Sequence, residues 1–222
     1  MYLSKLLVKK ESAKKTTTFF FEKPKKFKFI PGQFIEITLN KEVHSFSIAS
    51  SPEEKEVMIA TRMRPTKFKK FLGKLKIGAK IKIEGPFGQF VLHKNMGSVF
   101  LAGGIGITPF RSMIKSFPNR EITLFYSNRK PKEAVFLNEL INLGKQNKKF
   151  KLIATMTKAT KKEWNGHFGY ISQKMIKNNL KNWRSVIYYV VGSSGFVQAM
   201  ADILSKMGLK PEQIKTENFP GY

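Results

Sequence analysis

A glycine cluster near the middle of the chain carries the clearest chemical signal. The four apolar residues 99–102 predict a short, buried parallel strand. Thr108 can cap a helix after the glycines, and Pro109 suits its first turn because a missing N–H costs nothing there. A strand, a glycine turn and a helix N-terminus in this order present unpaired N–H groups and the positive end of a helix dipole to an anion. A phosphate group is the expected occupant of this turn, whose glycines are Gly103, Gly104 and Gly106.

A second group of polar and aromatic side chains lies in the N-terminal half. The run His44-Ser45-Phe46-Ser47 puts an aromatic ring beside hydroxyl groups at a strand end. A flat heterocycle could use both, with a ring to stack against and hydroxyls to hydrogen-bond its edge nitrogens. A purely structural role for these residues is the alternative. Another anion site at a helix start is predicted from Arg62, Arg64 and Thr66.

The segments up to about residue 92 have the composition of short strands. They are rich in β-branched or aromatic residues and are separated by turn formers, which predicts a closed, six-stranded antiparallel β-barrel. One helix interrupts the strands, because Thr66 can cap residues 67–72 and put Phe68, Phe71 and Leu72 on one face. The predicted strands are residues 3–9, 17–22, 33–39, 45–50, 56–62 and 80–84.

The pattern changes after Gly97, where strand-like runs alternate with helix-like runs. This alternation predicts an α/β domain with a five-stranded parallel sheet and helices on both faces. We therefore predict two domains, a barrel over residues 1–95 and an α/β domain over residues 96–222. The predicted strands are residues 99–102, 122–126, 150–155, 186–191 and 214–219, and the predicted helices are residues 109–117, 132–143, 173–180 and 195–207.

Composition narrows the class of protein. The 222 residues include no cysteine and three scattered histidines, so the sequence supplies no thiol nucleophile or thiolate cluster ligand, and no metal site is expected. No apolar run is long enough to span a bilayer and no cleavable signal pattern is present, which predicts a cytoplasmic protein. The 41 Lys and Arg against 15 Asp and Glu give a net charge of +26. Because these basic residues are spread along the chain, a lysine-rich solvated surface is favoured over a nucleic-acid site, and an acidic partner is a weaker expectation.

Six motifs follow one another in an order that resembles the ferredoxin–NADP reductase superfamily. They are His-Ser-Phe-Ser at 44–47, Gly-Pro-Phe-Gly at 85–88, Ala-Gly-Gly-Ile-Gly-Ile-Thr-Pro at 102–109, Phe-Tyr-Ser-Asn-Arg at 125–129, Val-Gly-Ser-Ser-Gly at 191–195 and Glu-Asn-Phe-Pro-Gly-Tyr at 217–222. The resemblance covers nearly the whole chain. It implies a flavin-binding barrel followed by a nicotinamide-dinucleotide domain, with FAD as the expected flavin, FMN as the less common one, and NADPH or NADH as co-substrate.

The resemblance assigns roles to the barrel motif. Phe46 stands where a tyrosine of the family packs against the flavin, and Ser47 stands where a hydroxyl hydrogen-bonds the reactive N5 edge. His44 replaces the arginine that meets the pyrophosphate, and a neutral histidine offers one donor where arginine offers a charged fork. The implied flavin-binding residues are His44, Ser45, Phe46, Ser47, Ile59, Thr61, Arg62, Arg64, Thr66, Phe219 and Tyr222.

The resemblance also assigns roles in the second domain. Val191 occupies the place of a cysteine found in many relatives, so hydride transfer here cannot depend on a thiol, and Ser47 and Glu217 are left as the catalytic polar groups beside the reacting rings. Phe219 or Tyr222 would cover the flavin, or the tail 217–222 only completes the sheet. The implied nucleotide-binding residues are Gly103, Gly104, Gly106, Thr108, Ser127, Arg129, Thr157, Lys158, Gly192 and Ser193. In this set, Ser127 and Arg129 follow the second strand, and Thr157 and Lys158 follow the third. All four are neutral or basic, which slightly favours the 2′-phosphate of NADP over the free hydroxyl of NAD.

The implied chemistry is hydride transfer from nicotinamide to flavin, followed by release of the electrons to a separate acceptor. The positive charge favours an acidic ferredoxin or flavodoxin as that acceptor, through electrostatic steering. The alternatives are a free-flavin or ferric reductase, or a nucleotide-binding electron-transfer subunit of a larger redox complex. We expect the protein to be a monomer.

Overall fold

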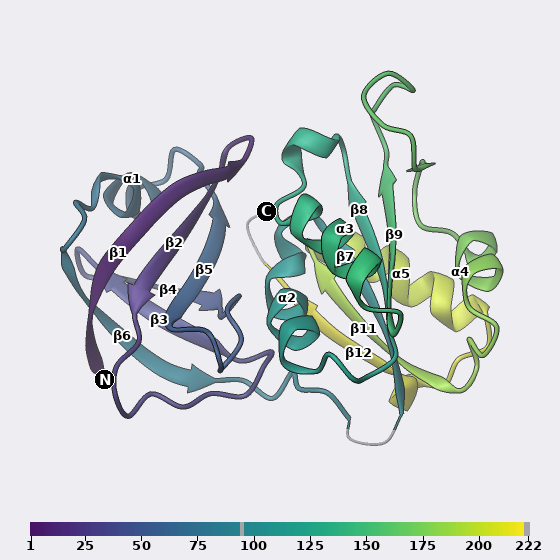
Figure 1. Ribbon diagram of the computed structural model, residues 1–222, viewed down its shortest axis with the longest axis horizontal. Coiled ribbons are helices and arrows are strands. Elements are labelled where there is room, and N and C mark those ends of the chain that lie inside the picture. The colour runs from purple at the N-terminus through teal and green to yellow at the C-terminus, as the bar shows by residue number, and fades with distance from the viewer. Residues whose placement is uncertain (94–95, 220–222) are drawn as a thin grey trace. The chain divides into compact units, whose positions relative to one another are not determined.

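The computed structural model describes residues 1–93 and 96–219, which form two compact units (Figure 1). The first unit comprises Met1–Val91 together with Thr108–Ser116. The second comprises Leu92–Ile107 and the chain from Phe117 onward. Among the described residues, no helix has the length and apolar character needed to cross a membrane.

The first unit is built on a six-stranded antiparallel sheet, as the sequence predicts. The strand order is β4-β3-β6-β1-β2-β5 (Figure 1). Each long strand is close to a predicted one, because β-branched and aromatic residues favour a pleated, half-buried surface. The strands are β1 (Tyr2–Ala13), β2 (Thr16–Glu22), β3 (Phe34–Leu39), β4 (Glu42–Ser47), β5 (Glu56–Arg62) and β6 (Lys80–Phe87).

The interior of the first unit is one apolar cluster rich in phenylalanine and isoleucine. Helix α1 (Lys67–Lys74) contributes Phe68 and Leu72, both fully buried, whereas Phe71 is 40% exposed. The predicted cap is confirmed, since the Thr66 side chain accepts a hydrogen bond from the Lys69 N–H. The cap and the two buried side chains fix α1 against the sheet.

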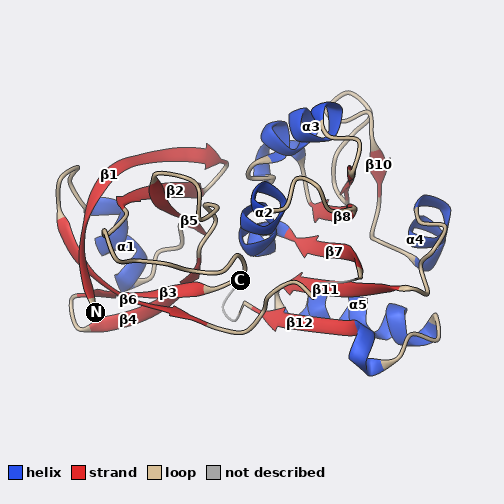
Figure 2. Ribbon diagram, turned by 60° about the horizontal axis from the view of Figure 1, so that its bottom comes forward, coloured by secondary structure: helices blue, strands red, loops and turns tan. Residues whose placement is uncertain are grey.

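The second unit contains a parallel sheet of order β10-β9-β8-β7-β11-β12, whose strands run in the same direction (Figure 2). The five predicted strands are present, and a two-residue strand is added at one edge, which is too short for composition to reveal. The strands are β7 (Gly97–Gly103), β8 (Ile122–Asn128), β9 (Phe150–Met156), β10 (His167–Phe168), β11 (Val186–Gly192) and β12 (Ile214–Asn218).

Two helices begin at other residues than the sequence predicts. The helix predicted over 132–143 is a 3₁₀ turn at Pro131–Glu133 followed by a later helix, because Phe136 adopts a left-handed backbone (φ 62°) between them. Thr108 lies inside α2 rather than at its cap, because the preceding 3₁₀ turn leads directly into the helix. The helices after α1 are α2 (Ile107–Ser116), α3 (Leu137–Gln146), α4 (Gln173–Asn179) and α5 (Ser194–Lys206).

Candidate functional site

The glycine turn after β7 combines one crowded position with one open position. A Cβ atom added to Gly106 would lie 2.3 Å from the Val191 carbonyl oxygen, so only glycine allows the turn to pack against β11. Gly104 has a left-handed backbone (φ 56°), and a Cβ atom there would meet no atom within 4 Å. The turn is therefore anchored on β11 at Gly106 and leaves its backbone accessible at Gly104.

The turn after β11 lies beside the glycine turn. Cβ atoms added to Gly103 or Gly192 would lie 2.7 Å and 2.6 Å from the ring of Phe196, in the first turn of α5. Ser193 caps α5, with its hydroxyl accepting a hydrogen bond from the Phe196 N–H. The structure thus brings Gly103, Gly192 and Ser193 together around Phe196, a ring that the sequence motifs did not single out.

The loops after β8 and β9 are joined through their backbones. The Thr157 N–H donates to the Asn128 carbonyl at 2.9 Å, and the Lys158 N–H donates to the Arg129 carbonyl at 2.8 Å. The side chains of Arg129 and Lys158 are exposed, so two cations stand at the carboxyl edge of the sheet. Ser127 lies at the same edge, paired in register with Thr155 on β9.

Asn128 is a polar side chain that the sequence analysis missed. It is 6% exposed, and neither its amide nitrogen nor its amide oxygen has a hydrogen-bond partner among the described residues. Burying an unpaired amide is costly, so such groups occur where a ligand or water completes them. Asn128 ends β8, next to the loops that carry Arg129 and Lys158.

Glu217 is a half-buried acid at the same edge of the sheet. It pairs in register with Val191 across β11 and β12, and one of its carboxylate oxygens, Oε2, is buried without a hydrogen-bond partner among the described residues. Desolvation by burial raises the pKa of Glu217 to about 7. Phe219 follows it and donates its N–H to the Gly192 carbonyl at 2.9 Å, while Tyr222 lies outside the described residues.

The raised pKa of Glu217 predicts a pH dependence of stability. The folded-state pKa of about 7 lies above the ordinary 4.5, so the folded state holds a proton that the unfolded state releases. The free energy of unfolding should therefore fall by about 3 kcal/mol as the pH rises from about 4.5 to about 7. Denaturant titrations across this range measure the effect. The fall should be absent in Glu217→Gln and present in Glu212→Gln, and an unchanged fall in Glu217→Gln would contradict the assignment.

Strand β4 presents the predicted barrel motif in two different environments. The Phe46 side chain is 5% exposed and stacks on Phe68 at a centroid distance of 5.8 Å, so most of its ring belongs to the core. His44 is exposed, and its ring lies 4.1 Å from the Phe68 ring. His44 and Phe46 therefore share one face of β4, beside α1.

The other predicted barrel residues divide into buried and exposed groups. Ser47, Ile59 and Thr61 are buried at 9%, 0% and 0% exposure, so neither the backbone nor the side chain of Ile59 or Thr61 reaches the surface of this structure. Ser45 is exposed, and its hydroxyl lies 3.5 Å from a carboxylate oxygen of Glu36. Arg62 is half-buried and Arg64 exposed, close in sequence to the Thr66 cap of α1.

Lys69 is the second functional candidate that the sequence analysis missed. Although charged, it is 8% exposed, and its ammonium donates to the Thr61 hydroxyl at 2.5 Å and lies 4.4 Å from the centroid of the Phe46 ring. Desolvation lowers the pKa of Lys69 to about 8. Sequence alone could not distinguish it, since exposed Lys67 and Lys70 flank it in the same helix.

Two family descriptions match the two parts of the chain. Residues 4–92 match the oxidoreductase FAD-binding domain, and residues 100–202 match the oxidoreductase NAD-binding domain. The first unit offers features that fit the FAD diphosphate, namely a buried ammonium and a helix cap beside His44. The second unit offers features that fit a dinucleotide, namely an open glycine turn and unpaired buried polar atoms. Among the described residues, no cluster of His, Asp and Glu could hold a metal ion.

Curated relatives share part of the sequence. One component of the Na(+)-translocating NADH-quinone reductase is 28% identical over 200 residues in Haemophilus ducreyi and 29% identical over 200 residues in Mannheimia succiniciproducens. Each match covers 81% of this chain and 49% of the relative. The chain therefore spans about half the length of the curated relatives it matches.

Solved structures share the fold across nearly the whole chain. The flavohem-like FAD/NAD binding domain of nitric oxide dioxygenase from Vibrio cholerae superimposes with a TM-score of 0.87 at 18% identity, covering 98% of both chains. A ferredoxin NADP+ reductase from Neisseria gonorrhoeae, with bound FAD and NADP, gives a TM-score of 0.84 at 20% identity and covers 100% of this chain and 98% of that chain. The chain therefore carries an oxidoreductase FAD-binding domain followed by an oxidoreductase NAD-binding domain, and it has the fold of a ferredoxin NADP+ reductase.

Proposed function

We propose that the protein passes electrons from NAD(P)H through FAD to a separate, acidic electron-carrier protein. The observation that carries this proposal is the succession of an FAD-binding and an NAD-binding oxidoreductase domain in one chain. FAD, when bound, accepts a hydride and can release its electrons one at a time. The residues of the chain bind and orient the two nucleotides and hold the polar groups that surround them.

In the first unit, we assign the flavin diphosphate to the region of His44 and the N-terminus of α1. The Thr66 cap, the exposed His44 ring and the buried Lys69 ammonium support this assignment, since charge-assisted donors bind phosphate oxygens most strongly. Arg62 and Arg64 add positive charge near the same cap. Ser47, at the end of β4, is the residue we assign to the reactive edge of the flavin.

In the second unit, we assign the dinucleotide to the carboxyl edge of the parallel sheet, where ligands of open α/β sheets bind. The accessible backbone at Gly104 supports a phosphate contact, and Arg129 and Lys158 support a contact with a 2′-phosphate, which favours NADP. The buried carboxyl of Glu217 is protonated below about pH 7, so it could hold a proton near the nicotinamide.

The Lys69 assignment predicts that FAD binding depends on pH. Because burial lowers the Lys69 pKa to about 8, a bound phosphate would favour the charged form, and FAD binding would take up a proton above that pH. We expect FAD affinity for the apoprotein to fall about tenfold between pH 7.5 and pH 9.5. Fluorescence titration of FAD measures it.

The matched variants for this prediction are Lys69→Met and Lys70→Met, one buried and one exposed in the same helix. Lys69→Met should bind FAD about tenfold more weakly at pH 7.5 and lose the pH dependence, while its thermal stability is unchanged or higher because a buried charge is removed. Lys70→Met should behave like the unaltered protein. Equal FAD affinity in both variants would show that Lys69 does not contact the flavin nucleotide.

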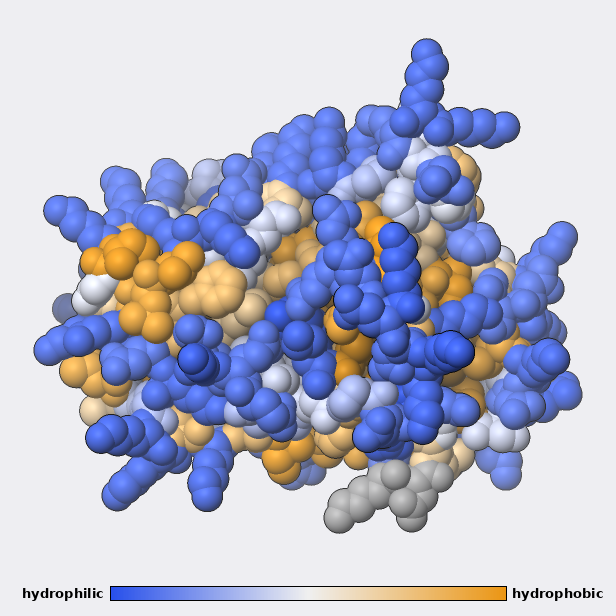
Figure 3. All heavy atoms as spheres, viewed as in Figure 1, coloured by the Kyte–Doolittle hydropathy of each residue, from blue (hydrophilic) through white to orange (hydrophobic). Residues whose placement is uncertain are grey.

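The net charge of +26 supports an acidic protein as the acceptor, because long-range attraction accelerates the encounter of oppositely charged proteins. Hydrophilic side chains cover much of the visible surface, interrupted by apolar patches (Figure 3). The test is stopped-flow reduction of an acidic ferredoxin or flavodoxin by the FAD-loaded protein with NADPH and with NADH, at 20 and 300 mM salt. The proposal expects a rate that falls at least about tenfold with salt, and a salt-independent rate would overturn the acidic carrier.

A second candidate function is electron transfer within a larger redox complex, with this chain as one of its components. The specific observation that favours it is the match to one component of a quinone reductase, of which this chain spans about half. A soluble quinone analogue and free ferric chelate or flavin, assayed beside the carrier proteins, separate the candidates. Turnover with free flavin or ferric chelate alone would instead identify a small-molecule reductase.

A further inference from the structure

The second unit contains a cavity at the amino ends of its parallel strands, the sheet edge opposite the carboxyl ends at which we place the dinucleotide. The cavity has a volume of about 400 Å³, within the range of small-molecule sites. Its wall is formed by the first residues of β7, β8 and β11 and by the segments that lead into β9 and out of α4. The amino ends of β7, β8 and β11 are the tails of their arrows in Figure 2.

Positive charge dominates the cavity wall. Four lysines line it with a single carboxylate, and they are Lys148, Lys149, Lys151 and Lys181, with Glu121 as the acid. In the described part of the chain, none of these four ammonium groups forms an ion pair. Three of these lysines lie within residues 148–151 and the fourth follows α4, and all four are exposed at the mouth of one hollow.

Two of the lysines are held in place by backbone carbonyls. The Lys149 ammonium donates to the Asn119 carbonyl at 3.1 Å, and the Lys151 ammonium donates to the Asn179 carbonyl at 2.8 Å. Each ammonium has three donors, so two remain for a ligand.

Ser98 supplies a polar group that the protein itself does not satisfy. Its residue is 3% exposed, it lines the cavity, and its hydroxyl has no hydrogen-bond partner among the described residues. The hydroxyl oxygen itself is sealed from solvent, so Ser98 lies behind the cavity wall and contributes its other atoms to the lining. The side chains of Thr123, Asn182 and Ser185 add neutral donors to the wall.

We propose that this cavity is a second anion site, which binds a small phosphate-bearing molecule at the sheet edge opposite the dinucleotide. Several cations around neutral hydroxyl and amide donors suit phosphate oxygens, which accept many hydrogen bonds and carry more than one charge. Pyrophosphate stands for this chemistry in the test. The proposal is independent of the function proposed above, since no cavity residue belongs to the flavin or dinucleotide sets.

The test is a pyrophosphate titration of the FAD-loaded protein, followed by calorimetry and by backbone NMR. The expected result is saturable binding, with the largest amide shifts at Ser98, Thr123 and Ser185. Absence of saturation, or shifts confined to the Gly103–Gly106 turn, would overturn the proposal. The first variant is Lys148→Glu with Lys181→Glu, which should weaken binding at least about tenfold.

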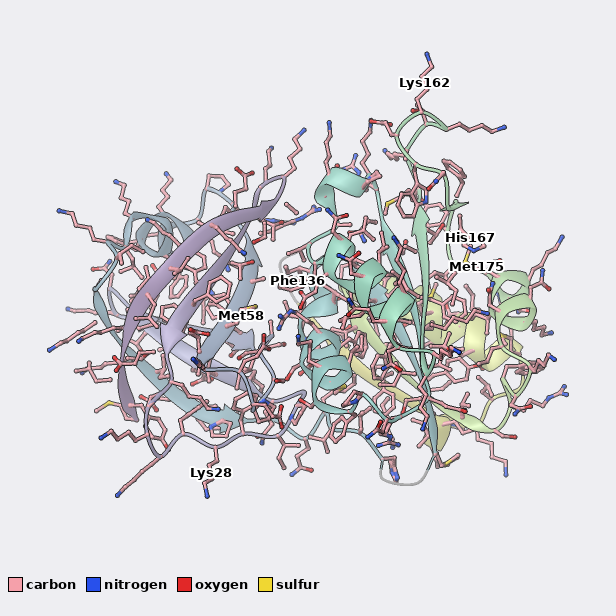
Figure 4. All side chains as sticks on the ribbon, in the orientation of Figure 1. Lys28, Met58, Phe136, Lys162, His167 and Met175 are labelled. Carbon is pink, nitrogen blue, oxygen red and sulfur yellow. The ribbon has the colours of Figure 1, made fainter. Side chains whose placement is uncertain are left out.

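A matched pair of lysine substitutions in the loop between β9 and β10 controls for the change in net charge. Lys161→Glu with Lys162→Glu makes the same change in total charge at exposed positions, and Lys162 projects from the tip of that loop (Figure 4). This pair should leave binding within about twofold, because the loop follows the carboxyl end of β9 and the cavity lies at its amino end. Seven strand residues span roughly 23 Å, more than the screening length in salt. Equal weakening by both pairs would identify diffuse attraction to a basic protein and overturn the site.

Lys181→Met keeps the test decisive if the double lysine variant fails to fold. Removing one exposed ammonium from the wall should leave the thermal midpoint unchanged and should weaken pyrophosphate binding about threefold. Unchanged affinity in Lys181→Met, with unchanged fold, would overturn the placement of the anion in the cavity.

Discussion

Replacing Arg111 by methionine is expected to destabilise the first unit by about 3–5 kcal/mol. Arg111 lies on α2, is 4% exposed, and binds both carboxylate oxygens of Glu54 at 2.9 and 3.0 Å. Its guanidinium also donates to the Ala49 carbonyl at 2.8 Å. The variant would remove two donors from the half-buried Glu54 carboxylate, which keeps the Ser51 N–H, and one donor from the Ala49 carbonyl. Losing these donors costs more than the net value of the ion pair.

The same pair predicts an acid-sensitive stability. Burial raises the pKa of Glu54, but the hydrogen bonds and charge of Arg111, together with the Ser51 N–H and the charge of Lys115, outweigh burial and hold the pKa below 4.5. The stabilisation is therefore present above pH 4.5 and is lost as the pH falls through the lowered folded-state pKa. In Arg111→Met, the Ser51 N–H and Lys115 would be left to oppose the effect of burial on the Glu54 pKa, so the acid-sensitive stabilisation should shrink.

Denaturant unfolding between pH 3 and pH 8 measures both effects. Lys115→Met is the control, because Lys115 lies on the same helix and adds only a small charge interaction with Glu54. We expect this control to change stability by less than about 1 kcal/mol. A loss in Arg111→Met no larger than that of the control would mean that the bidentate pair does not stabilise the folded unit.

The architecture was predictable because its signals are local. Apolar runs of four to six residues between turn formers identify strands whatever lies elsewhere in the chain, as with the buried run at residues 99–102. The Thr66 cap and the stop at Gly208 (φ 82°) also follow from single residues and their immediate neighbours. The left-handed Phe136 gives no such signal, which is why the predicted helix at 132–143 begins too early.

The missing parts of the candidate site depend on contacts between distant segments. Nothing in the composition of residues 108–116 indicates that Arg111 binds Glu54, 57 positions earlier, and so groups α2 with the first unit. Lys69 is one of many lysines until the fold buries it beside Phe46. Asn128 similarly becomes informative only when its unpaired amide is seen to be buried. Spacing indicates which turns are suited to nucleotides, but not which side chains the fold desolvates.

Replacing Gly106 by alanine is the second change with a large expected effect. The new Cβ atom would lie 2.3 Å from the Val191 oxygen, 2.6 Å from the Val191 carbonyl carbon and 2.9 Å from the Gly192 nitrogen. These are backbone atoms of β11, so no rotation of a side chain relieves the clash. We expect a loss of about 3 kcal/mol or more in unfolding free energy and an NADP(H) affinity at least about tenfold weaker, because the turn must move away from β11.

Gly104→Ala is the matched control two residues earlier. It places alanine in a left-handed backbone with no atom within 4 Å of the new Cβ, so the cost is limited to about 1–2 kcal/mol of backbone strain. Thermal unfolding and a calorimetric titration of NADP+ on both variants give the comparison. Since close approach to β11 is specific to Gly106, its variant must be the less stable of the two. Equal stability would show that the turn has freedom to move, and the nucleotide would then not depend on a fixed backbone at this position.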